Sequence, residues 1–180
     1  FRIQQTEATL MDPQQRLLLQ VTHKTLISSS LLSTEHGAAL GVFVGISACD
    51  YSNVLRAMRT TPSPYTGTGG ALSVAAGRLS YHYGASGPSL SMDTACSSSL
   101  VAAHFVSVSR STADIASGLC GGVNLTLESN TALAFTSAGM LSPEGRCKTL
   151  DASADGYVRG ESCGVMLFLP HIGPGAVETQ

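Results

Sequence analysis

The sequence predicts an α/β fold in which strands and helices alternate and pack in layers. Apolar runs at 39–46 and 163–169 are short enough for strands, and the first is apolar on both faces, as in a central strand covered on both sides. Between such runs lie segments with the apolar spacing of helices, several of them bounded by glycine or proline. Alternating buried strands and helices indicate a layered α/β architecture.

The first predicted helix covers residues 13–27. Asp12 stands at its N-cap position and Pro13 in its first turn, and apolar residues recur along one face. After the strand at 39–46, we expect a short helix at 50–58 and an irregular loop at 60–70, because the loop segment is rich in proline and glycine.

The middle of the chain begins with a predicted helix of small residues at 71–83, for which Gly84 is a suitable C-cap. The later predicted elements are a strand at 89–92, an apolar helix at 97–108, a buried strand with a glycine bulge at 114–127, a short helix at 128–138 and, after a long loop, the strand at 163–169.

The composition of the 180 residues is unusually apolar. Hydrophobic residues make up 43% and charged residues 12%, whereas about a quarter of the residues are charged in typical globular domains. This composition excludes disorder and indicates that much of the surface is buried against something else. The chain begins with Phe1 and ends in a loop-like tail, so we expect one partial domain, 1–180, without an internal boundary.

Charge and apolar patterning also narrow the function classes. Ten basic and twelve acidic residues give a net charge of −2 without a basic cluster, which argues against nucleic acid or an anionic membrane as a partner. The apolar runs are too short to span a bilayer and the N-terminus lacks the features of a leader, so a cytoplasmic location is expected. The five cysteines form no C-x-x-C pair, which argues against a metal site and a disulfide framework.

The stretch 91–100 carries the clearest chemical signal. A strand passes through a tight turn into an apolar helix, and Cys96 lies where the N–H groups of the helix N-terminus are unpaired. The partial positive charge there favours a thiolate. The arrangement is similar to the nucleophile elbow of hydrolases, although the G-x-S-x-G pattern is absent. This pattern leaves two interpretations open, a reactive nucleophile or a small buried hydrophobic residue.

Four blocks of the sequence closely resemble the ketosynthase (β-ketoacyl synthase) domain of type I polyketide synthases, of which the condensing domain of animal-type fatty acid synthases is a near relative. They are MDPQQRLLL at 11–19, YTGTGGALSVAAGRLSYHYGASGPSLSMD at 65–93, DTACSSSL at 93–100 and GMLSPEGRCKTLDASADGYVRGE at 139–161. The resemblance spans residues 8–168 in order. It identifies Cys96 as the expected nucleophile.

The resemblance implies the N-terminal half of a thiolase-like, layered α-β-α-β-α fold that works as a homodimer. It also implies decarboxylative Claisen condensation, in which Cys96 accepts an acyl chain from the phosphopantetheine of an acyl carrier protein, with no further cofactor. The N–H of Cys96 is the expected first donor to the oxyanion. Phe135 falls where the family has an aromatic side chain along the acyl pocket; the alternative is a core phenylalanine.

The sequence also departs from the family. Two histidine blocks and a glycine-rich turn of the family's C-terminal half do not occur, so the remaining half is an expected partner and this chain is expected to be inactive alone. Structural or solvent roles are expected for the five histidines present, His23, His36, His82, His104 and His171. Salt bridges and turn hydrogen bonds are expected for the loop residues Asp151, Asp155, Arg159 and Glu161.

Two other function classes compete with the ketosynthase hypothesis. A non-catalytic dimerisation or scaffold segment would have no need of Cys96, whose presence therefore speaks against it. A cysteine hydrolase needs a histidine beside the thiol, and no sequence context nominates one. The starter, the extender and the product cannot be predicted from this chain.

Overall fold

A four-stranded sheet forms the centre of the computed structural model, which describes residues 1–29, 39–47 and 50–170. Its order is β2-β1-β3-β4, with β1 at Leu40–Gly45, β2 at Ser89–Met92, β3 at Ser117–Asn124 and β4 at Ser162–Phe168. β1 pairs in parallel with β2 and β3, whereas β3 and β4 are antiparallel. The ends of each strand lie at most a few residues from the ends that the sequence predicts.

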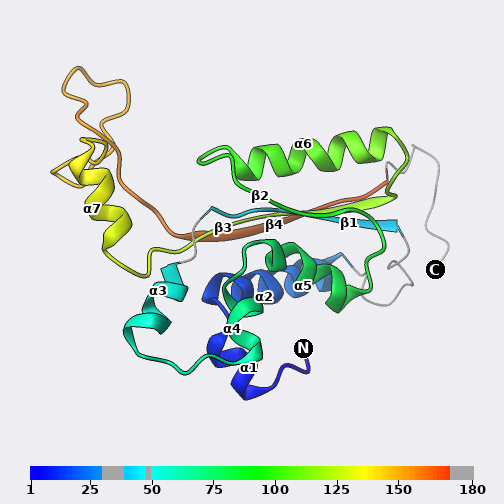
Figure 1. Cartoon of the computed structure of the whole chain (residues 1–180). Helices are drawn as coiled ribbons and strands as arrows, with labels where there is room; N and C mark the ends of the chain where they lie inside the picture. Colours follow the sequence, from blue (N-terminus) through cyan, green and yellow to red (C-terminus); the bar gives the residue numbers. More distant parts are fainter. Residues whose placement is uncertain (30–38, 48–49, 171–180) are drawn as a thin grey trace.

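Helices cover both faces of this sheet (Figure 1). On one face α6 (Ser98–Ser111) packs on β1 and β3, and on the other α2 (Pro13–Ser28) and α5 (Ser73–Tyr83) pack on the sheet. The remaining helices are α1 (Gln5–Leu10), α3 (Asp50–Ala57), α4 (Pro64–Gly70) and α7 (Asn130–Ser137). The predicted layered α/β architecture is confirmed. None of the helices in the described ranges is both long and apolar enough to cross a membrane.

The two faces of β1 supply the two halves of the core. Val42 and Val44 point to the α2 and α5 side, where they are fully buried with Leu18. Phe43, between them in sequence, is buried on the α6 side with Val106. This alternation follows from the two-residue period of a strand, and it explains why a strand covered on both faces is apolar at every position.

The helix boundaries follow local signals at α2 and α5. The Asp12 carboxylate accepts a hydrogen bond from the backbone N–H of Gln14 at 2.7 Å, and Pro13 occupies the first helical position. Gly84 ends α5 in the left-handed conformation, with φ of 61°. Both predictions are confirmed.

The prediction of an irregular loop at 60–70 is wrong, because residues 64–70 form α4. Three glycines make this a poor helix by intrinsic propensity, but Ser63 and Thr66 form a capping box and Pro64 starts the helix. The Gln15 side chain then donates hydrogen bonds to carbonyl oxygens at the end of α4, those of Thr68, Gly69 and Ala71. Tertiary contacts therefore stabilise a helix that the sequence disfavours.

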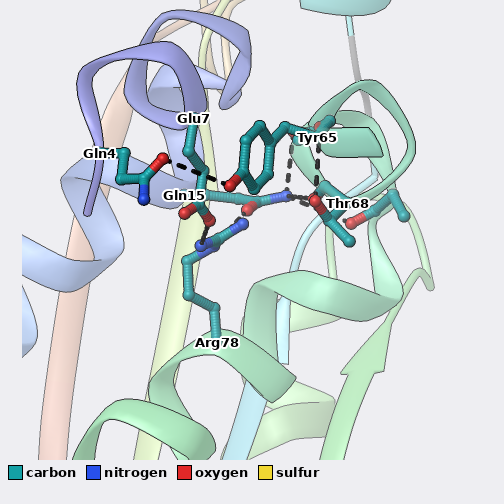
Figure 2. Close-up of polar contacts among 8 residues, drawn as sticks. Gln4, Glu7, Gln15, Tyr65, Thr68 and Arg78 are labelled. Carbon is teal, nitrogen blue, oxygen red and sulfur yellow. Dashed lines mark hydrogen bonds and ion pairs between the residues drawn. The ribbon is translucent and has the colours of Figure 1, made fainter. Parts of the chain in front are cut away.

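The same glutamine belongs to a polar network that joins four helices (Figure 2). Arg78 of α5 donates a hydrogen bond from Nε to Gln15 Oε1 at 2.9 Å and forms an ion pair with Glu7 of α1. The Tyr65 hydroxyl of α4 donates to Gln4 Oε1 at 3.5 Å. The network fixes α1, α2, α4 and α5 against one another.

The glycine bulge predicted in the strand at 114–127 is also wrong. The pairing of β3 with β1 runs without interruption from Ser117 to Gly122, and β3 pairs in register with β4 as well. The glycines have a packing role instead. A Cβ at Gly121 would lie 3.2 Å from Leu18 Cδ2, and one at Gly122 would lie 2.8 Å from Ser99 Cβ.

Candidate active site

Cys96 lies in a tight turn between the end of β2 and the start of α6. Ala95, directly before it, has φ of 55°, a left-handed conformation that is costly for any residue with a Cβ. The Cys96 side chain is exposed. The interpretation of Cys96 as a small buried hydrophobic residue is therefore wrong, and the predicted elbow geometry is present.

Ser98 holds this turn together through its buried side chain. Its hydroxyl accepts a hydrogen bond from the Thr94 N–H at 2.9 Å and donates one to the Ala95 carbonyl oxygen at 2.6 Å. Asp93 Oδ1 accepts a further hydrogen bond, from the Ala95 N–H at 2.9 Å. These bonds tie the residues on both sides of Cys96 and offset the strained backbone of Ala95.

Two glycines allow the start of α6 to lie directly on the sheet. A Cβ on Gly45, the last residue of β1, would lie 2.6 Å from backbone atoms of both Ser98 and Ser99. A Cβ on Gly122 of the neighbouring β3 would lie 2.8 Å from Ser99 Cβ. The position of the Cys96 turn therefore depends on the absence of side chains at the ends of two adjacent strands.

Replacing Ser98 with alanine is expected to lower the free energy of unfolding by about 1–3 kcal/mol, because both part-buried hydrogen bonds of its hydroxyl, from the Thr94 N–H and to the Ala95 carbonyl oxygen, are lost. Alkylation of Cys96 should slow several-fold in the same variant as the turn loosens. Urea denaturation and rates of labelling by iodoacetamide, measured by peptide mass, test both effects. Ser107→Ala, at an exposed position of the same helix, is the matched control. Unchanged stability and labelling in Ser98→Ala would contradict this role.

A cavity of about 1090 Å³ opens beside the turn. Cys96 and Phe135 both line it, so the structure brings together the two site residues that the sequence singled out. Phe135, on α7, is half-buried and belongs to neither core cluster. The other walls come from the ends of β1 and β3, residues of β4 and the segment 157–160.

Arg159 also lines this cavity, a position that the sequence did not indicate. Its guanidinium carbon lies over the Phe135 ring, 5.0 Å from the centroid, a cation–π contact. The salt bridge predicted for Arg159 is wrong within the described part of the chain, where no carboxylate pairs with it. Only the fold shows which acidic side chains lie near Arg159, so the sequence could not predict the missing ion pair.

Asp151 and Asp155 behave as predicted, whereas Glu161 makes a long-range hydrogen bond instead of a salt bridge or a turn contact. Asp155 accepts from Lys148 Nζ at 3.0 Å and from the Ser142 hydroxyl at 2.9 Å, and these bonds hold the pKa of its carboxyl below the usual range. Asp151 accepts from the Ser153 N–H at 2.8 Å within a turn. Glu161 accepts from the backbone N–H of Thr126 at 2.7 Å, and so ties the loop to the end of β3.

The remaining described cysteines have different surroundings. Cys120 also lines the cavity but is buried, and its thiol donates to the Ser99 carbonyl oxygen at 3.6 Å. Burial raises the pKa of the Cys120 thiol and raises that of Cys163 to about 11, so both stay protonated at neutral pH. Cys147 is exposed, and its sulfur accepts from the Val158 N–H at 3.2 Å.

No histidine of the described segments lines the cavity. His104 is exposed on α6, and His23 and His82 both contact the Phe1 ring. Desolvation, with smaller effects of the N-terminal amino group and His23, lowers the pKa of His82. His36 and His171 lie outside the described residues.

No metal site is present in the described segments. Their His, Cys, Asp and Glu side chains form no group of three or more that could hold a metal ion.

The whole of this arrangement falls within a match to a known family model. Residues 1–171 match the model described as Beta-ketoacyl synthase, N-terminal domain. Among curated proteins, the chain is similar to two different chains of the phenolphthiocerol/phthiocerol polyketide synthase of Mycobacterium tuberculosis. It is 48% identical to one over 172 residues and 42% identical to the other over 169 residues. Each match covers 93% of this chain but only 8% and 11% of those proteins.

Solved structures give the same result for the fold. The chain is similar to the ketosynthase from module 6 of the bacillaene synthase of Bacillus subtilis, with a TM-score of 0.79 and 35% identity. It is also similar to an oxazolomycin ketosynthase domain of Streptomyces albus, with a TM-score of 0.81 and 33% identity. The matches cover 92% and 94% of this chain and 28% and 29% of the solved chains.

Proposed function

The chain belongs to the β-ketoacyl synthase family, and from this premise we propose that it carries the nucleophilic part of a site for decarboxylative Claisen condensation in polyketide biosynthesis. The thiolase-like fold is that of the matched ketosynthase structures. The observation that carries the proposal is the exposed Cys96 thiol, set on a strained elbow and open to a cavity that Phe135 also lines.

The first step is transfer of the acyl group to Cys96. The thiolate attacks the carbonyl carbon of an acyl thioester on an acyl carrier protein, and a new carbon–sulfur bond forms as the original thioester bond breaks. The phosphopantetheine thiol leaves as a thiolate and takes up a proton. The N–H of Cys96 donates to the oxyanion of the tetrahedral intermediate, and the partial charge of the α6 N-terminus acts in the same direction.

The second step forms the carbon–carbon bond. A malonyl-type thioester loses its carboxylate as CO₂, and the electron pair of the broken bond attacks the acyl carbon on Cys96. The Cys96 sulfur leaves as a thiolate, and the extended β-ketoacyl chain remains on the carrier. Phe135 lines the cavity, and in this proposal the apolar acyl chain lies beside its ring.

Decarboxylation belongs, in this proposal, to two histidines and a second oxyanion donor in the C-terminal half of the domain, which the family resemblance implies. The low charge of this chain supports burial against that half and against the mate of a homodimer. The acyl carrier protein is the third partner, and the proposed location is the cytoplasm. Alone, the chain presents the thiol without completing the condensation.

The test is the position of the acyl group after the full-length protein reacts with an acyl thioester. We expect acylation at Cys96, and at least tenfold less at Cys120 and Cys163, because burial raises the pKa of both thiols and keeps them protonated. Peptide mass spectrometry measures the distribution. Exposed Cys147 is the internal control for mere accessibility. Equal acylation of Cys96 and Cys147 would favour the scaffold alternative over catalysis.

A further inference from the structure

Arg159 stands out among the charged side chains of the cavity. Asp93 and Arg159 are the two charged residues that line it among the described residues. Asp93 already accepts the N–H of Ala95 as part of the elbow. Arg159 has neither an ion pair nor a hydrogen bond from its guanidinium within the described segments, and its buried Nε lacks an acceptor there.

The surroundings of Arg159 hold it in place without neutralising it. The Asn124 amide donates to the Gly160 carbonyl oxygen at 2.7 Å, and the Thr126 N–H donates to the Glu161 carboxylate at 2.7 Å. These contacts attach the backbone beside Arg159 to the end of β3. The Phe135 ring supports the guanidinium by a cation–π contact, which uses the π face and leaves the in-plane N–H donors unused.

The other basic residues of the same loop are in different situations. Lys148 is paired with both Glu144 and Asp155, at 3.3 and 3.0 Å. Arg146 is exposed and does not line the cavity. Arg159 is thus the basic residue of the described cavity wall, and no described carboxylate forms an ion pair with it.

We propose that Arg159 is an anion-binding residue of the Cys96 cavity and that it takes a carboxylate or phosphate group of a thioester substrate. The inference rests on the proposed function, which brings both groups to the cavity: the extender carries a carboxylate, and the carrier arm carries a phosphate. A planar guanidinium with free donors matches either group by paired N–H···O hydrogen bonds. The contact also satisfies the guanidinium donors that have no acceptor among the described residues.

The experiment compares Arg159→Gln with the unmodified full-length protein on small substrates that separate the two anions. Acetyl-N-acetylcysteamine has neither anion, malonyl-N-acetylcysteamine has the carboxylate, and acetyl-phosphopantetheine has the phosphate. We expect KM to rise on the order of tenfold or more for the substrate whose anion Arg159 binds, as for a lost hydrogen bond to a charged group. Acylation of Cys96 by the uncharged donor should change less than twofold.

The pattern of the three substrates identifies the anion. A selective effect on the malonyl thioester assigns the carboxylate, and a selective effect on acetyl-phosphopantetheine assigns the phosphate. Arg159→Lys should recover part of the loss because it keeps the charge. Arg146→Gln, a change of the same type at an exposed position of the same loop, should have no effect. Equal effects on all three substrates, or none, would overturn the proposal.

A second measurement does not depend on a folded variant. In the unmodified protein, malonate or inorganic phosphate should slow the alkylation of Cys96 by iodoacetamide in a saturable way, whereas neutral malonamide should not. Absence of protection by both anions would contradict an anion site near the thiol. If the uncharged donor never acylates Cys96, the proposed function itself fails; if it does but anions have no effect, only the role of Arg159 fails.

Discussion

Gly45→Ala is expected to lower the free energy of unfolding by about 2–3 kcal/mol, among the larger costs of overpacking by a single methyl group. The added Cβ would lie 2.6 Å from Ser98 C and Ser99 N. These are backbone atoms in the first turn of α6, so they cannot move aside as the end of a flexible side chain can. The helix start must shift away from β1, and the Cys96 turn must shift with it.

Urea denaturation of the full-length protein, together with the rate of Cys96 alkylation, measures both consequences of Gly45→Ala. Gly164→Ala is a matched control for stability, because Gly164 is also a strand residue of this sheet and a Cβ there would meet no atom within 4 Å. Its stability should change by about 0.5 kcal/mol or less. If Gly45→Ala is as stable as Gly164→Ala and Cys96 reacts equally fast in both, close packing of α6 on the sheet does not position the Cys96 turn.

Cys96→Ala is expected to abolish formation of the acyl-enzyme and to reduce condensation by about 10⁴-fold or more, as in enzymes that lose a covalent nucleophile. Because the side chain is exposed, the free energy of unfolding should change by about 0.5 kcal/mol or less. Intact-protein mass after reaction with an acyl thioester, and product formation with a malonyl thioester, measure the two losses.

The matched control for Cys96→Ala is Cys147→Ala, which also removes an exposed thiol. That variant should still form the acyl-enzyme at Cys96, even though the Val158 N–H loses its sulfur acceptor. Residual condensation in Cys96→Ala at a rate close to that of Cys147→Ala would mean that the carbon–carbon bond forms without a thioester on this residue. The competing scaffold hypothesis gives this chain no catalytic role, so it predicts that neither cysteine substitution changes the rate of condensation.

Local signals are enough to predict the Cys96 turn but not its surroundings. The order of strand, turn and helix around Cys96 follows from adjacent residues, and so does the N-cap of α2 at Asp12. The cavity joins the end of β1, the elbow, α7 and residues 157–160, which are far apart in the sequence. Sequence spacing contains no information on which of these segments face one another.

The two wrong predictions of backbone conformation have a common physical cause. Glycine favours irregular backbone at 60–70 and a bulge near Gly122, but in both places tertiary packing decides the conformation. Gln15 binds the end of α4, and Gly122 makes room for Ser99. The capping box at Ser63 and Thr66, with Pro64 between them, is the sequence signal for α4. For Gly122, only knowledge of the neighbouring helix could distinguish a bulge from a close contact.

The antiparallel direction of β4 has a consequence for how such a site can diversify. Asn124 and Ser162 are paired neighbours in the sheet, so the chain that leaves β3 returns beside its point of departure. The intervening segment, with α7 and the long loop, extends from one end of the sheet (Figure 1). It supplies Phe135 and Arg159, a whole wall of the cavity. Under the proposed function, substrate preference can therefore change by exchange of one contiguous segment, while the strands and the Cys96 turn keep their sequence.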